Sequence, residues 1–109
     1  MLASLLGSVN KERDLVYLHA RGKGYAREIA RFFEGSLYPV QNALDRLEEA
    51  GVLVGRNVGT TREYEFNPRY PARREIAALI DRALSLYPSA LREKMMMVRA
   101  RPRRRGKPL

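Results

Sequence analysis

The chain has 109 residues, of which 45% are apolar and 30% are charged, a composition that suits one compact domain with a modest core. The apolar runs are only a few residues long, so we expect no membrane-spanning segment, and the N-terminal residues do not predict a signal peptide. Because the sequence has no Cys, it excludes disulfides and thiolate metal sites, and a cytoplasmic location fits.

Positive charge is the most informative property of the composition. Lys and Arg number 21 against 12 Asp and Glu, a net charge of +9. The segment "RARPRRRGKPL" (99–109) holds six cations and no acid, so the remainder carries 15 minus 12, or +3. Such a chain attracts polyanions, chiefly nucleic acid or an anionic membrane surface. We expect one domain over 1–88, then a short helix and a basic, disordered tail over 89–109. That tail either only solubilises the protein or contacts phosphates.

Two helices are predicted in the first third of the chain. The first covers residues 10–20, and Ser8 or Asn10 can cap it because their side-chain oxygens accept from free N–H groups. Two glycines in "RGKG" (21–24) then interrupt the pattern. The second helix is "YAREIARFFEG" (25–35), whose apolar residues recur at the spacing of one buried face, and Gly35 is expected to end it in the left-handed conformation.

A third helix over residues 36–50 is predicted next, with Ser36 as its N-cap and Gly51 free to adopt a positive φ at its end. A hairpin follows, in which "VLV" and "REYEF" are strands and "GRNVGTT" contains the tip. Another amphipathic helix covers residues 71–86 and stops at "YP" (87–88). A last short helix carries "MMMV" (95–98), which is expected to pack or to form a dimer surface.

This order of elements predicts a helix-turn-helix with a two-stranded wing, an α+β fold that is mostly α. The apolar stripe of the third helix packs inward, so its opposite face is left to enter the major groove of DNA. The expected base contacts are Tyr38, Gln41, Asn42 and Asp45. The two amide side chains both donate and accept, which suits adenine, whereas Asp45 either accepts from a cytosine amino group or repels phosphates.

Cations and hydroxyls around this helix are expected to contact the DNA backbone. Two arginines flank the tip of the wing, so the hairpin can straddle a phosphate strand and reach the minor groove. The expected backbone contacts are Ser36, Arg27, Arg31, Arg46, Arg56, Thr60, Thr61 and Arg62. The alternative for each is an ordinary solvated side chain. His19, the only His, is expected in the core or at an interface rather than at a metal.

The segments "AREIARFFEGS", "LYPVQNALDRLEEAGVL" and "VGRNVGTTREYEFNP" resemble, in this order, the ArsR-like winged-helix transcriptional regulators of bacteria and archaea. The resemblance covers residues 2–86. The "NP" and "YP" near its end are also similar to winged-helix domains found beside nucleotidyltransferases. The resemblance to ArsR-like regulators implies a homodimer that binds a palindromic operator, often as a repressor. It also implies that residues 36–50 are the recognition helix and residues 54–66 the wing. The implied dimer contacts are Leu5, Leu6, Leu79, Ile80 and Leu84.

The residues bear on three classes of function. A DNA-binding regulator accounts for most of the pattern, and a winged-helix adaptor for protein or RNA is the alternative. An enzyme is not expected, because we find no nucleophile–base pair and no Gly-rich phosphate loop joined to a strand. No cofactor is expected. The metal-sensing members of the resembled family use Cys or His clusters, and this chain offers one His and no Cys.

Overall fold

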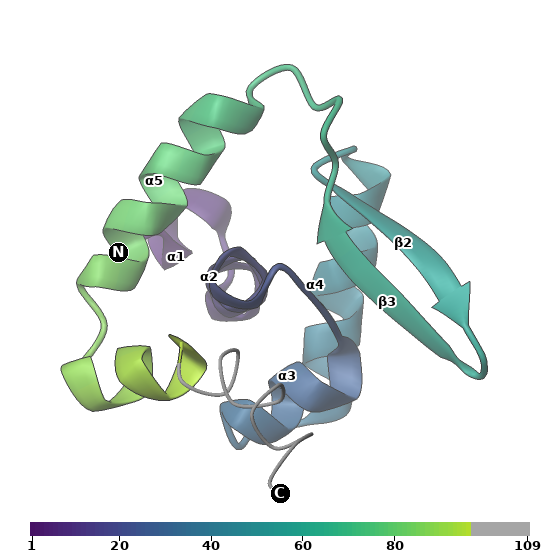
Figure 1. The fold of residues 1–109 in the computed structure, drawn as a ribbon, viewed down its shortest axis with the longest axis horizontal. Helices are drawn as coiled ribbons and strands as arrows, with labels where there is room; N and C mark the ends of the chain where they lie inside the picture. Colours follow the sequence, from purple (N-terminus) through teal and green to yellow (C-terminus); the bar gives the residue numbers. More distant parts are fainter. Residues whose placement is uncertain (97–109) are drawn as a thin grey trace, which may run out of the picture.

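The structure, a computed structural model, describes residues 1–96 (Figure 1). In chain order the elements are α1 (Ala3–Leu6), α2 (Val9–Arg21), β1 (Lys23–Tyr25), α3 (Ala26–Phe32), α4 (Leu37–Glu49), β2 (Leu53–Val58), β3 (Thr61–Phe66) and α5 (Arg73–Ser85). Residues 89–96 are also helical. Within the described range, no helix is both long and apolar enough to cross a membrane.

Helix α2 lies at the centre of the molecule and contacts α1, α3, α4 and α5 (Figure 1). This position explains why Val16 and Leu18 are fully buried. The predicted cap is confirmed, because the Ser8 side chain accepts a hydrogen bond from the Lys11 amide at 3.1 Å. The helix predicted over 10–20 is therefore confirmed with one extra residue at each end.

The end of α3 differs from the prediction. Glu34, not Gly35, has the left-handed conformation, with a φ of 56°. The Glu34 amide donates to the Arg31 carbonyl at 3.2 Å, and the Gly35 amide donates to the Ala30 carbonyl at 2.9 Å. This pair of bonds defines a Schellman motif whose left-handed position is Glu34. The prediction for Gly35 was therefore wrong by one residue.

Helix α4 begins after Ser36, which has the predicted N-cap position although its side chain makes no capping hydrogen bond. The helix buries Val40, Leu44 and Leu47 of the predicted apolar stripe, whereas Leu37, which was also expected in that stripe, is 42% exposed. The C-terminal end of α4 is also a Schellman motif, and here the glycine does have the left-handed position. The Gly51 φ is 85°, and the next amide, that of Val52, donates to the Leu47 carbonyl at 3.0 Å.

The wing is confirmed, but the sheet has three antiparallel strands in the order β1-β3-β2. Val58 pairs with Thr61, which leaves a two-residue turn with Gly59 at a φ of 63°, as a type II′ turn needs. Strand β1 was missed by the sequence pattern. Its central Gly24 pairs with Tyr64, and a Cβ there would lie 2.8 Å from the Glu28 carboxylate and 3.1 Å from the Tyr17 ring.

Helix α5 packs against α2 through Ile80, Ala83 and Leu84. The helical residues 89–96 belong to the same core, because Met95 is fully buried in it. The Arg21 guanidinium also donates to the Met95 carbonyl at 2.8 Å. Packing therefore continues past the boundary that we predicted at residue 88. The basic segment 99–109 lies outside the described residues.

Candidate nucleic-acid interface

The outward face of α4 is the part of the helix that the core leaves free. Tyr38 has 77% of its surface exposed, and Asn42 and Asp45 are also exposed. Gln41 is half-buried, because it leans toward the hairpin. These four predicted base-contact residues recur at the i, i+3, i+4, i+7 spacing of one helix face, opposite the buried stripe.

A cleft of about 310 Å³ is lined by this face and by the wing. Its lining combines residues of α3, α4 and the hairpin, among them Arg27, Gln41, Asp45, Thr60, Thr61 and Arg62. The structure thus brings together six of the residues that the sequence predicted to contact DNA. Tyr25, Leu37 and Tyr64 complete most of the wall.

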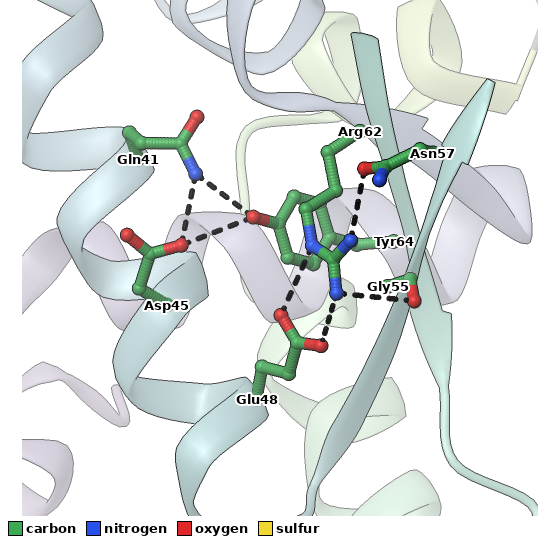
Figure 2. A network of polar contacts seen from close by, with 7 residues as sticks. All are labelled: Gln41, Asp45, Glu48, Gly55, Asn57, Arg62 and Tyr64. Carbon is green, nitrogen blue, oxygen red and sulfur yellow. Dashed lines mark hydrogen bonds and ion pairs between the residues drawn. The ribbon is translucent and has the colours of Figure 1, made fainter. Parts of the chain in front are cut away.

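Three side chains form a closed hydrogen-bonded triangle between α4 and β3 (Figure 2). The Gln41 amide nitrogen donates to Asp45 Oδ1 at 3.0 Å and to the Tyr64 hydroxyl oxygen at 2.8 Å, and the Tyr64 hydroxyl donates to Asp45 Oδ1 at 3.1 Å. We call this the amide triangle. Burial raises the pKa of Tyr64, so the hydroxyl keeps the proton that it donates.

Arg62, one of the predicted backbone contacts, turns toward α4 (Figure 2). Its guanidinium donates to the Glu48 carboxylate at 2.6 and 3.3 Å, to Asn57 Oδ1 at 3.0 Å and to the Gly55 carbonyl at 3.2 Å. The hydrogen bond to Glu48 is the main cause of a raised pKa of Arg62. We call these contacts the wing brace. Glu48, Asn57 and Gly55 together engage most of the Arg62 donors, and the contact of Arg62 with the DNA backbone stays a prediction.

A glycine makes room for the wing brace. A Cβ on Gly55 would lie 2.8 Å from Arg62 Nε and 3.1 Å from Cζ. Only a residue without a side chain therefore lets the guanidinium lie across β2 on its way to Glu48. The signal was present in the sequence, because strand alternation places Arg62 on the same side as Tyr64 and Phe66, the side that faces the protein.

Most other predicted backbone contacts lie on the surface. Arg27, Arg31, Arg46, Ser36, Thr60 and Thr61 are exposed. Arg56 is exposed too, and it makes an ion pair at 3.3 Å with Glu63, its direct cross-strand partner. Thr61 donates its hydroxyl to the Val58 carbonyl at 2.9 Å, so it is occupied in closing the turn of the hairpin.

The predicted dimer contacts separate into two groups. Ile80 and Leu84 are 1% and 6% exposed because they belong to the core of the chain itself, which corrects the expectation that they lie on an interface. Leu6 is partly buried against that core. Leu5 and Leu79, at 72% and 38% exposed, remain open to another molecule.

His19 lies at the contact of α2 with α5. Its Nε2 is 3.2 Å from Asp81 Oδ1 on α5. Across residues 1–96, no group of three or more His, Asp or Glu side chains is arranged to hold a metal ion.

The three-helix core, helix α4 beside a hairpin, and the flanking helices together define a winged helix-turn-helix fold of the α+β class, mostly α, as predicted. Two solved structures share this fold. One is the adhesin competence repressor AdcR from Streptococcus pyogenes, with 17% sequence identity, 89% of this chain and 78% of that chain covered, and a TM-score of 0.55. The other is a mutant of ZitR from Lactococcus lactis in apo form, with 18% identity, 79% and 68% covered, and a TM-score of 0.52. No protein-family model and no curated protein matches the chain.

Proposed function

We propose that this protein is a sequence-specific regulator of transcription that binds double-stranded DNA, most simply as a repressor. The observation that carries the proposal is the free outward face of α4, with Tyr38 and Asn42 exposed beside a hairpin. A helix projecting in this way fits the major groove, and the hairpin then reaches the adjacent backbone or minor groove. The name of one structural neighbour, a repressor, supports the same reading.

The charge distribution around α4 supports a moderate rather than a strong general affinity for DNA. The helix carries the acids Asp45, Glu48 and Glu49 against one cation, Arg46. The wing brace neutralises Glu48, and the exposed Arg27 of α3 adds positive charge at one side of the cleft. We therefore expect phosphate contacts to come from Arg27, Arg31 and the wing, and base contacts to come from α4.

Binding to random-sequence and selected duplexes at several salt concentrations tests the proposal. Arg27→Gln should weaken binding to every duplex. The slope of log K against log salt should also become shallower by about 1, because the variant makes one phosphate contact fewer and binding therefore releases fewer counterions. The matched control is Arg82→Gln on α5, which lies on the opposite side of α2 from the wing (Figure 1). Equal losses of DNA affinity in the Arg27→Gln and Arg82→Gln variants would mean that DNA does not bind at the cleft between α4 and the wing.

Base contacts require a separate variant. Asn42→Ala should reduce the preference for the selected site over random DNA by about 1–3 kcal/mol while leaving the salt dependence unchanged. An adaptor for protein or RNA is the second candidate, and the same assay distinguishes it. RNA binding equal to DNA binding, lost when residues 99–109 are removed, would favour the adaptor.

The oligomeric state, the location and the lack of catalytic activity are proposed from the resemblance to ArsR-like regulators. We propose a cytoplasmic homodimer without catalytic activity, with the exposed Leu5 and Leu79 at the dimer contact in place of the buried residues. A pair of identical recognition helices would then read a palindrome. A mass in solution equal to one chain, with and without operator DNA, would contradict the dimer.

A further inference from the structure

The amide triangle restricts what the recognition helix can read. An amide side chain ordinarily offers both a donor and an acceptor, which is why Gln is associated with adenine. Here the Gln41 nitrogen makes two donor contacts, both with partners inside the protein, to Asp45 Oδ1 at 3.0 Å and to the Tyr64 hydroxyl at 2.8 Å. An amide nitrogen carries two hydrogens, so these two contacts account for its donor capacity.

The orientation of the Gln41 amide follows from its partners. An ionised carboxylate only accepts hydrogen bonds, so the amide nitrogen, and not the oxygen, must face Asp45. The Tyr64 hydroxyl gives its single hydrogen to the same carboxylate oxygen at 3.1 Å and therefore receives the Gln41 hydrogen on its oxygen. Turning the amide over would place Gln41 Oε1 against Asp45 and lose both bonds.

The triangle is also held in place. Tyr64 is fully buried and lies in the central strand of the sheet, where β1 and β2 pair with it from both sides. Its hydroxyl is therefore a fixed point for the two side chains of α4. On α4, the buried Val40 and Leu44 fix the helix under Gln41 and Asp45.

What remains for a ligand is a pair of acceptors. Gln41 Oε1 and Asp45 Oδ2 make none of the bonds of the triangle, and Figure 2 shows both oxygens pointing away from it. Asp45 is exposed and Gln41 half-exposed, both at the cleft. In the major groove the donors are the N4 amino group of cytosine and the N6 amino group of adenine, whereas guanine and thymine present oxygen acceptors at the equivalent positions.

We propose that the positions of the DNA strand facing Gln41 and Asp45 are read by a two-acceptor site, which selects an amino base (adenine or cytosine) over a keto base (guanine or thymine). The selection rests on the proposed DNA-binding function. Adenine and cytosine are accepted alike, since the site uses only the amino group and has no donor for adenine N7. Guanine and thymine are rejected, because their keto oxygens would face a carboxylate. Tyr64 acts as a positioning residue, since it holds the acceptors without touching the base.

The test uses the full chain and duplexes selected from a random library. The position read by α4 is found as the one whose preference is lost in Gln41→Ala, and four duplexes with each base at that position are then compared. We expect adenine and cytosine to bind equally, and guanine and thymine about 5- to 100-fold more weakly. Replacing adenine by 7-deazaadenine, which lacks N7 and keeps the amino group, should change nothing.

Tyr64→Phe supplies the matched variant, because it removes one oxygen and keeps the buried ring. It frees a Gln41 hydrogen, so adenine should become favoured over cytosine, and 7-deazaadenine should now weaken binding. Tyr70→Phe, at a partly buried tyrosine outside the triangle, is the control. A wild-type preference for adenine over cytosine, a need for N7, or no position sensitive to Gln41 would overturn the inference. If only the two-acceptor site is wrong, the protein should still bind duplexes in a salt-dependent way. A lack of any salt-dependent duplex binding would overturn the proposed DNA-binding function as well.

Discussion

Asp14 is the most unusual residue of the core, and its replacement gives a sharp prediction. The side chain is 0% exposed, and neither carboxyl oxygen has a hydrogen-bond partner among residues 1–96. Burial raises the pKa of Asp14 from 3.8 to about 8. The folded state therefore favours the protonated acid. The contribution of this group to stability is fully present below the ordinary pKa and is lost as the pH rises toward about 8.

The size of this effect follows from the two pKa values. Linkage with a pKa of 3.8 in the unfolded chain and about 8 in the folded chain gives a loss of stability on the order of 2–3 kcal/mol between pH 5 and pH 7. Asp14→Asn has nearly the same shape and no charge to titrate. The free energy of unfolding of the variant should therefore rise relative to wild type by about that amount over the same interval.

Urea denaturation of both proteins at half-unit steps from pH 5 to pH 8 measures the effect. The difference between the two curves removes the contribution of every other titrating group, because those groups are common to both proteins. Glu49→Gln, at an exposed carboxylate of α4, is the control and should give a flat difference. Parallel curves for wild type and Asp14→Asn would refute the reasoning, since they would mean that Asp14 titrates equally in both states.

Three further predictions concern the wing, the N-terminal helices and the dimer. Gly55→Ala should displace Arg62 and speed amide hydrogen exchange in the hairpin, whereas Gly35→Ala, where an added Cβ meets nothing within 4 Å, should leave exchange unchanged. Tyr87→Phe removes a 2.8 Å hydrogen bond to the buried Glu12, which should cost about 1–3 kcal/mol in urea denaturation at pH 7. Burial alone would raise the pKa of Glu12, but the hydrogen bond from Tyr87 helps to lower it, so part of this stabilisation should disappear as the pH falls below 4.5. Leu79→Glu should convert the proposed dimer to monomer in light scattering, because the side chain is 38% exposed and open to another molecule; an unchanged mass would exclude Leu79 from the contact.

The helices and the hairpin could be predicted because their signals are local. A cap at Ser8, a stripe at Val40, Leu44 and Leu47, and a glycine turn at Gly59 each depend on a few neighbouring residues. Strand β1 could not be predicted in this way. Its three residues show no alternation, and they form a strand only because β3 pairs with them across some forty residues of chain.

The site residues were predicted by position but not by partner. Helical spacing placed Gln41 and Asp45 on the outward face, and the structure brings both to the cleft. Spacing within a helix says nothing about the hydroxyl of Tyr64, which comes from another element and fixes the amide. Likewise, Glu48 carried no signal of its own, because the meaning of its charge depends on how α4 and the wing meet.

The shared strand β3 has a mechanical consequence. It pairs with β1 on one edge and β2 on the other, and α3 begins at the residue after β1 ends. A push on the hairpin tip is therefore transmitted to the start of α3, and through the Glu48–Arg62 ion pair to the last turns of α4. The hairpin, α3 and α4 should therefore tilt together as one rigid unit. A partner that binds the hairpin would reorient both helices rather than bend the hairpin alone.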